Sequence, residues 1–322
     1  MTLTQPFLHR RSLENSSWYM GHLFSNLAAS EETAGALCVA EVTMRPGMEP
    51  PPHVHRREAE LLFILDGTLE GFCGDTPICA RPGELVVLPK DKPHGWRVSA
   101  GKDGISARAL LILVPGATGE YFRRQSIPAA ALTLPDLGDN QYAKKMQQDL
   151  PQMIADAAEF EIEWMPPGYA PTLQAAPAEP KPALNVLGET FQPLAASWET
   201  GGALTAILWT SPDESLVPRH VHHESDEAFY ILEGEAAVTV GDDFCVIARP
   251  GDFVFLPKNI PHSHRSHNGK PARALQLLTP GGIEGGLAEV AALLPQELTP
   301  QAVGEIAGRY NLSLLPESES HA

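Results

Sequence analysis

The sequence predicts an all-β protein made of two tandem jelly-roll barrels with a few linking helices. Three observations support this fold class. Short apolar segments rich in Val, Leu and Ile recur along the chain, 30 Pro and 27 Gly punctuate it, and the whole pattern occurs twice. Many short strands separated by tight turns are typical of sandwiches and barrels. We therefore expect each half of the chain to form its own barrel.

The expected strands of the first half lie between turn signals such as Asp66-Gly67 and Pro115-Gly116. They cover residues 37–44, 59–65, 68–73, 85–88 and 108–114. The second half repeats the pattern at residues 204–210, 228–232, 236–240, 253–256 and 274–278. This regular spacing favours a closed β architecture in both halves.

The chain also repeats in detail. His53-Val54-His55 recurs as His220-Val221-His222, and the turn Arg81-Pro82-Gly83 recurs as Arg249-Pro250-Gly251. Near the end of each copy, Phe160-Glu161-Ile162 resembles Tyr310-Asn311-Leu312. The two copies are offset by 167 residues, the distance from His53 to His220. Solenoid repeats are only about 20–50 residues long, so this offset indicates a duplicated domain.

These observations predict an N-terminal domain over residues 1–142, a linker over 143–185 and a C-terminal domain over 186–322. Within the linker, apolar residues at helical spacing predict a helix over 143–159. Residues 166–182 are rich in Pro and Ala and lack such spacing, which is typical of an extended, semi-rigid connection.

Composition excludes some classes of function. The chain has 322 residues with 23 Lys and Arg against 40 Asp and Glu, a net charge of −17. A nucleic-acid-binding surface needs clustered cations, so we expect no such partner. No run reaches about 18 apolar residues, so no membrane span is expected. No secretory signal is evident, so we expect the protein in the cytoplasm. We also expect it to form a homodimer.

Four cysteines, Cys38, Cys73, Cys79 and Cys245, form no CxxC pair and no zinc spacing. We expect them to be small buried apolar residues rather than parts of a disulfide framework.

The residues suited to chemistry are histidines and a glutamate at fixed spacing. His53 and His55 lie two apart, which places both side chains on one face of a strand. Glu60 follows five residues later, and a Pro-His pair supplies His94. Three imidazoles and a carboxylate bind a divalent transition metal and leave a coordination position open.

The second copy supplies the same set as His220, His222, Glu227 and His262. A lone buried His is usually a satisfied core residue, but four ligand-type residues at matching spacing in two copies indicate metal sites. We therefore predict one metal ion in each barrel.

At these residues the chain resembles the cupin family. Gly47, His53, His55, Glu60 and Gly67 fit its first motif, and Gly83, Pro89 and His94 fit its second, with Asp91 and Val98 in place of the usual Gly and Asn. In the second copy the motif residues are His220, His222, Glu227, Gly234, Gly251, Pro257 and His262; Glu214, Asn259 and Ser266 are departures. The departures lie at turns and at the motif's end, so they affect loop geometry and leave every ligand in place.

The chain also resembles a group of two-domain cupins, the flavonol (quercetin) dioxygenases. The points of likeness are the PPxHVH segment at residues 50–55, the four-residue gap to Glu60, the VLPK segment at residues 87–90 before Pro93-His94, and the long helical and Pro-rich segment between the halves. The resemblance implies a bound Fe, Mn, Ni, Co or Cu ion whose open positions receive a small-molecule substrate and O2. It also implies that Glu60, and Glu227 in the second copy, act as general bases toward a substrate hydroxyl. A flavonol would yield a ring-opened ester and carbon monoxide.

Three alternatives remain open from the sequence. An oxalate decarboxylase carries the same ligands and would need a small, polar, Arg-bearing pocket. A metal-dependent isomerase or hydrolase of small metabolites is a second possibility, and a non-catalytic binding cupin is a third.

Other residues near the motifs are weaker candidates. Glu58 is expected to be a solvated charge because its repeat partner is Ser225. His264 is expected either to pack in the core or to support a metal ligand. His223 is expected at the surface and His267 in a loop. Five apolar residues of the first half could line a pocket beside its metal site, but we expect them to pack in the core of the barrel. They are Met44, Met48, Phe63, Phe72 and Trp96.

Overall fold

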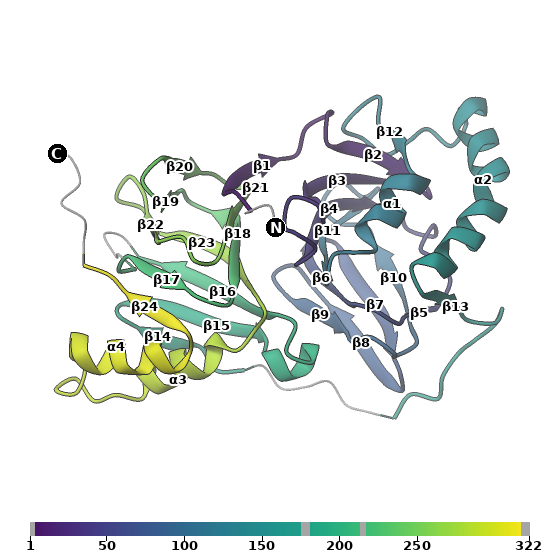
Figure 1. Cartoon of the computed structure of the whole chain (residues 1–322). Helices are drawn as coiled ribbons and strands as arrows, with labels where there is room; N and C mark the ends of the chain where they lie inside the picture. Colours follow the sequence, from purple (N-terminus) through teal and green to yellow (C-terminus); the bar gives the residue numbers. More distant parts are fainter. Residues whose placement is uncertain (1–3, 175–180, 213–216, 317–322) are drawn as a thin grey trace. The chain divides into compact units, whose positions relative to one another are not determined.

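The computed structural model describes residues 4–174, 181–212 and 217–316 and divides into two compact units (Figure 1). One unit, Arg11–Glu179, is called the N-terminal barrel below. The other combines Met1–Arg10 with Pro180–Ala322 and is called the C-terminal barrel. None of the described helices has the length and apolar character needed to cross a membrane.

In its described residues, the N-terminal barrel consists of two antiparallel sheets with two helices. Its elements are β2 (Ser16–Tyr19), β3 (His22–Ala28), β4 (Cys38–Met44), β5 (His53–His55), β6 (Ala59–Asp66), β7 (Thr68–Cys73), β8 (Thr76–Ala80), β9 (Leu85–Leu88), β10 (His94–Ser99), β11 (Ala107–Val114), α1 (Gly119–Gln125), β12 (Ile127–Pro128), α2 (Asn140–Glu159) and β13 (Ile162–Trp164). One sheet has the order β12-β2-β3-β4-β11-β6-β9, and the other β13-β5-β10-β7-β8.

The C-terminal barrel has the same plan. Its elements are β1 (Phe7–Arg10), β14 (Leu184–Val186), β15 (Glu189–Ala195), the 3₁₀ turn η1 (Ser197–Thr200), β16 (Thr205–Ser211), β17 (His220–His222), β18 (Asp226–Glu233), β19 (Ala236–Val240), β20 (Phe244–Ala248), β21 (Asp252–Leu256), β22 (His262–Ser266), β23 (Ala272–Thr279), α3 (Ile283–Ala291), α4 (Pro300–Arg309) and β24 (Leu312–Leu314). The sheet orders are β1-β21-β18-β23-β16-β15-β14 and β20-β19-β22-β17-β24.

The predicted duplication is confirmed strand by strand. In both barrels the strand with the HxH pair lies in the smaller sheet, and the strand with the glutamate lies in the larger one. The similar tails also serve the same purpose. Ile162 of β13 pairs with His55, and Leu312 of β24 pairs with His222, so each tail returns as an edge strand beside an HxH pair.

Alternation along the strands sets the inner face of each barrel. Leu62 and Ile64 lie two and four residues after Glu60 on β6, and both belong to the buried core with Leu111 and Leu113 of β11. Fully burying one such side chain contributes roughly 1.5–3 kcal/mol. Glu60 therefore shares its strand face with core residues and enters an apolar interior.

The domain boundaries drawn from the sequence need correction at the N-terminus. Residues before Arg11 were assigned to the N-terminal domain, yet β1 pairs with β21 of the C-terminal barrel in the register Phe7 to Phe255. The rings of these two residues stack with centroids 5.2 Å apart. An exposed strand edge accepts any compatible strand, so distance along the chain did not decide this pairing.

The linker prediction is also modified. The expected helix over 143–159 is present as α2, but it packs within the N-terminal barrel, where Met153 and Ala157 are buried with Phe160. The expected Pro-rich connection lies partly outside the described residues. The cysteine expectation was half right: all four are free thiols, with Cys38 and Cys73 buried but Cys79 and Cys245 exposed.

Candidate metal centres

In the N-terminal barrel, four ligand-type side chains converge from both sheets. His53 and His55 come from β5, His94 from β10 and Glu60 from β6, and all four are buried. The Nε2 atoms of His55, His94 and His53 lie 3.3, 3.5 and 3.8 Å from Oε2 of Glu60. The predicted set is therefore brought together at one point between the sheets.

The other ring nitrogen of each histidine is held from behind. Nδ1 of His53 lies 2.9 Å from the carbonyl oxygen of Pro51, and Nδ1 of His94 lies 3.0 Å from that of Lys92. Nδ1 of His55 lies 2.8 Å from a carboxylate oxygen of Glu58. Because these acceptors require a proton on Nδ1, they leave each Nε2 lone pair directed at the shared point.

The C-terminal barrel repeats the cluster. His220 and His222 of β17, Glu227 of β18 and His262 of β22 are all buried. The Nε2 atoms of His262, His222 and His220 lie 2.9, 3.7 and 4.0 Å from Oε2 of Glu227. In each cluster the four candidate ligand atoms lie within 4.8 Å of one another.

The supporting contacts of the second cluster differ from those of the first. Backbone carbonyls again face Nδ1 of His220, at 2.8 Å from Pro218, and Nδ1 of His262, at 2.9 Å from Ile260. No described carboxylate faces Nδ1 of His222. Instead, the amide Nε2 of Gln276 donates a hydrogen bond to Oε1 of Glu227.

Two turns position the third histidine of each cluster. Asp91 and Asn259, where the cupin motif usually has Gly, both have left-handed backbones with φ of 67° and 63°. Asp and Asn tolerate this conformation better than most residues. The backbone N–H of Asp91 donates to the carbonyl of His55, and that of Asn259 to His222, each at 2.8 Å. The motif departures therefore keep the geometry that Gly would give.

Electrostatics favour an ionised glutamate in each cluster. Burial acts to raise the pKa of Glu60, but contacts with His53, His55 and His94 outweigh it and hold the pKa well below its usual range. Burial likewise acts to raise the pKa of Glu227, and His262 and His222 lower it well below normal. Both carboxylates are thus anionic at neutral pH and suited to a cation.

The donor set fits a transition-metal ion by a further criterion. Oε2 of Glu60, Oε2 of Glu227 and Nε2 of His262 are buried and have no hydrogen-bond partner among the described residues. A buried carboxylate oxygen without a partner is costly, and a cation offsets that cost. Imidazole with carboxylate suits several divalent ions, including Mn, Fe, Co, Ni and Cu.

A cavity lies beside each cluster. The one in the N-terminal barrel has a volume of about 50 Å³ and is lined by His53, His55 and Glu60 together with Tyr121 and Trp164. Of the residues considered as pocket lining, Met44 and Trp96 also border it, whereas Phe63 is buried in the core.

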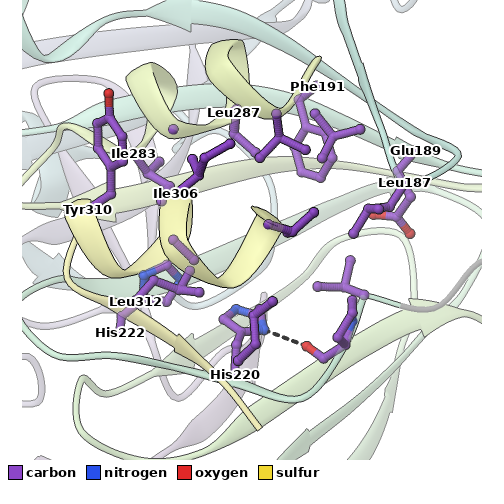
Figure 2. Close-up of a pocket in the computed structure, with 18 of the residues that line it drawn as sticks. Leu187, Glu189, Phe191, His220, His222, Ile283, Leu287, Ile306, Tyr310 and Leu312 are labelled. Atoms are coloured by element: carbon purple, nitrogen blue, oxygen red, sulfur yellow. Dashed lines mark hydrogen bonds between the residues drawn. The ribbon is translucent and has the colours of Figure 1, made fainter. Parts of the chain in front are cut away.

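The cavity of the C-terminal barrel is larger, about 120 Å³, and mostly apolar. Figure 2 shows Ile283 and Leu287 of α3 and Ile306 of α4 over the space that contains His220 and His222. His264 also lines it, buried between the rings of Trp209 and Phe229 at centroid distances of 4.9 and 4.6 Å.

Some expectations for single residues were wrong or incomplete. Glu58 was expected to be a solvated charge, yet it is 1% exposed and contacts His55, because the turn after β5 folds back into the barrel. Thr118 and Gln276 were missed. They lie 60 and 49 residues from the glutamates that they contact, so no local sequence pattern identifies them. His223 is exposed, as expected.

Fold and sites together define a class of protein. The cupin-domain family matches residues 40–112 and 208–278, one match in each barrel. The chain therefore contains two cupin domains, each with one His- and Glu-rich metal-binding site.

Particular relatives are similar to it. Quercetin 2,3-dioxygenase of Bacillus subtilis (strain 168) is 24% identical over 300 residues, covering 87% of this chain and 84% of the relative. Germin-like protein 1-1 of Oryza sativa subsp. japonica is 28% identical over 131 residues, which is 38% of this chain and 56% of that protein.

Solved structures of Bacillus subtilis oxalate decarboxylase are similar in fold. The structure at pH 4.6 has a TM-score of 0.54 at 15% identity, covering 87% of this chain and 77% of that one. Another, studied for its Mn(II) centres, has a TM-score of 0.55 at 15% identity, covering 88% and 78%. At such identity the likeness supports the fold alone.

Proposed function

We propose that this two-domain cupin is a metal-dependent dioxygenase that cleaves a flavonol-like or other enolic aromatic molecule with O2. The observation that carries the proposal is a buried three-histidine, one-glutamate cluster that opens into an apolar cavity. The similarity to a quercetin 2,3-dioxygenase over most of both chains supports the same reaction class.

In this proposal the ligands of the two ions are His53, His55, Glu60 and His94, and His220, His222, Glu227 and His262. A bound redox-capable ion would supply the Lewis acidity and electron transfer that O2 chemistry requires. Each Nδ1 acceptor keeps an imidazole oriented, and the apolar walls exclude water from the reacting groups.

Glu60 and Glu227 are proposed to accept the proton of the substrate hydroxyl. Each has one carboxylate oxygen without a hydrogen-bond partner beside the three Nε2 atoms. A general base must lie within hydrogen-bond reach of the proton it takes, and a substrate hydroxyl bound at the cluster would lie beside these carboxylates.

The lining of the cavities favours an aromatic substrate over oxalate. Among the described residues that border the two cavities there is no Lys or Arg. Oxalate carries two negative charges and would leave one carboxylate without a cationic partner in apolar surroundings, which is costly. Three alternatives to the dioxygenase remain to be tested: oxalate decarboxylation, isomerisation of a small metabolite, and metal binding without catalysis.

The test is oxygen uptake by protein reconstituted separately with each candidate metal. With quercetin, we expect O2 consumption with release of carbon monoxide, reduced at least 100-fold in Glu60→Gln combined with Glu227→Gln. The single variants would report which barrel reacts. Oxalate consumption without net O2 uptake would favour the decarboxylase, and metal binding without turnover of either compound would leave a binding protein.

We also propose a cytoplasmic homodimer. Free thiols at all four cysteines fit a reducing compartment. Light scattering after gel filtration tests the dimer: a mass near 34.8 kDa would contradict it.

A further inference from the structure

The two clusters differ in what lies behind the second histidine. In the N-terminal barrel, Nδ1 of His55 donates to Oε1 of Glu58 at 2.8 Å, and both side chains are almost completely buried. The hydroxyl of Thr118 donates to the same oxygen and fixes the carboxylate from the other side. Glu58 thus directs a buried carboxyl group at the back of a proposed metal ligand.

The C-terminal barrel has no counterpart. Ser225 occupies the position of Glu58 in the repeat, and its hydroxyl donates to the carbonyl of Pro280 at 2.7 Å. Among the described residues no carboxylate approaches Nδ1 of His222.

The two clusters also differ in what contacts the ligand glutamate. Glu60 pairs with Leu113 on β11, and Glu227 pairs with Leu278 on β23. Two residues earlier on these strands lie Leu111 and Gln276. Gln276 donates a hydrogen bond to Glu227, whereas Leu111 offers none to Glu60. A donor on a ligand carboxylate withdraws electron density from it and weakens it as a ligand.

A carboxylate behind a ligating imidazole has the opposite effect. It fixes the tautomer and the ring orientation, and it raises the basicity of the ring, so the histidine binds metal more strongly. Loss of such a partner typically costs 10- to 100-fold in metal affinity. A cation on the Nε2 side of His55 also offsets the cost of burying Glu58, whose Oε2 has no partner among the described residues.

We propose that Glu58 is a positioning residue that makes the N-terminal barrel the tighter of the two metal sites, so that the sites fill in order. The inference rests on the assignment of both clusters as metal sites in the proposed function. It adds that the duplicated sites have diverged, one with a carboxylate behind its histidine and one with an amide on its glutamate.

The test uses the full chain with one site disabled at a time. His262→Ala leaves the N-terminal site and His94→Ala leaves the C-terminal site. After removal of metal with a chelator, Mn(II) is titrated and free Mn(II) is measured by its EPR signal. We expect the N-terminal site to bind 10- to 100-fold more tightly.

Adding Glu58→Gln to the His262→Ala protein should weaken Mn(II) binding 10- to 100-fold and change the fine structure of the bound Mn(II) spectrum. Ser225→Ala in the His94→Ala protein is the matched control and should change neither. Thr118→Val, which leaves both Glu58 and His55 in place, should give a smaller loss in the same direction. Circular dichroism of each metal-free variant establishes that it folds.

The outcomes test the metal sites and the role of Glu58 separately. If neither single-site protein binds Mn(II), the metal assignment fails, and the inference fails with it. If both bind with equal affinity, or if folded Glu58→Gln protein retains its affinity within twofold, the metal assignment stands and the role of Glu58 is refuted.

Discussion

Gln276 donates a hydrogen bond to Oε1 of Glu227, whereas Leu111, at the corresponding strand position of the other barrel, is apolar and has no donor for Glu60. The pair shows how the duplicated clusters keep their ligands while differing in the residues around them.

Replacing Gln276 with Leu removes the donor and leaves Oε1 of Glu227 buried without this partner. We expect the metal-free protein to lose about 1–3 kcal/mol of unfolding free energy, the usual cost of such a group. The Tm increase on adding Mn(II) should become larger in the variant, since a cation then satisfies the carboxylate. Leu111→Gln is the reciprocal control, and thermal unfolding with and without Mn(II) measures both. An unchanged Tm increase would contradict the prediction.

Metal removal should lower stability because the ligands converge only in the folded chain. A ligand at 100 times its Kd stabilises the state that binds it by about 2.7 kcal/mol per site. We expect Mn(II) to raise the Tm of the wild type, and to raise it less in His94→Ala and in His262→Ala. A protein with both substitutions serves as the control, and a Tm increase of wild-type size in it would show that Mn(II) acts elsewhere.

His22 should make stability depend on pH. Burial lowers its pKa to about 4, while a hydrogen bond to the carbonyl of Met48 opposes the shift. The unfolded chain, with a pKa near 6.5, binds a proton at higher pH than the folded one, so stability is present above about pH 6.5 and is lost as the pH falls toward 4. The total loss is about 3 kcal/mol for this group. Urea unfolding of His22→Gln should show a shallower pH dependence over this window, and equal slopes would exclude the effect.

Gly67 should tolerate no side chain. Its φ is +82°, and a Cβ atom would lie 2.4 Å from the carbonyl oxygen of Ser99. Gly83, in the same barrel, has a φ of +90° but no atom within 4 Å of such a Cβ. We expect Gly83→Ala to cost about 1 kcal/mol from the backbone conformation alone and Gly67→Ala to cost clearly more. Chemical denaturation compares them, and equal losses would mean that the contact with Ser99 is relieved at no cost.

Leu287→Trp should fill the cavity of the C-terminal barrel without touching its ligands. Leu287 lies on α3 at the cavity wall. If the C-terminal site turns over quercetin, kcat/KM in the Glu60→Gln background should fall at least tenfold, because the larger ring occupies the substrate's space. Mn(II) content should remain that of the parent. Retained activity with full metal content would show that the substrate does not occupy this cavity.

The sequence predicted much of this molecule because its signals are local or repeated. The strands at 68–73, 85–88 and 236–240 coincide with β7, β9 and β19. The HxH spacing predicts a shared strand face, and the same spacing in a second copy makes chance an inadequate explanation. The capping helices α3 and α4 went unpredicted, since a 9-residue and a 10-residue helix that cover an apolar cavity give only a weak periodic signal.

The sequence alone predicted the duplicated barrels and the eight candidate ligands, because strand alternation and a fixed, repeated spacing indicate which side chains share a face. Glu58, Thr118 and Gln276 became visible only in the tertiary structure. Their effects depend on whether a carboxylate or an amide comes within hydrogen-bond distance of a ligand from another strand or helix. That is a property of packing in three dimensions, and chain separations of 60 residues for Glu58 with Thr118 and 49 for Gln276 with Glu227 carry no local signal of it.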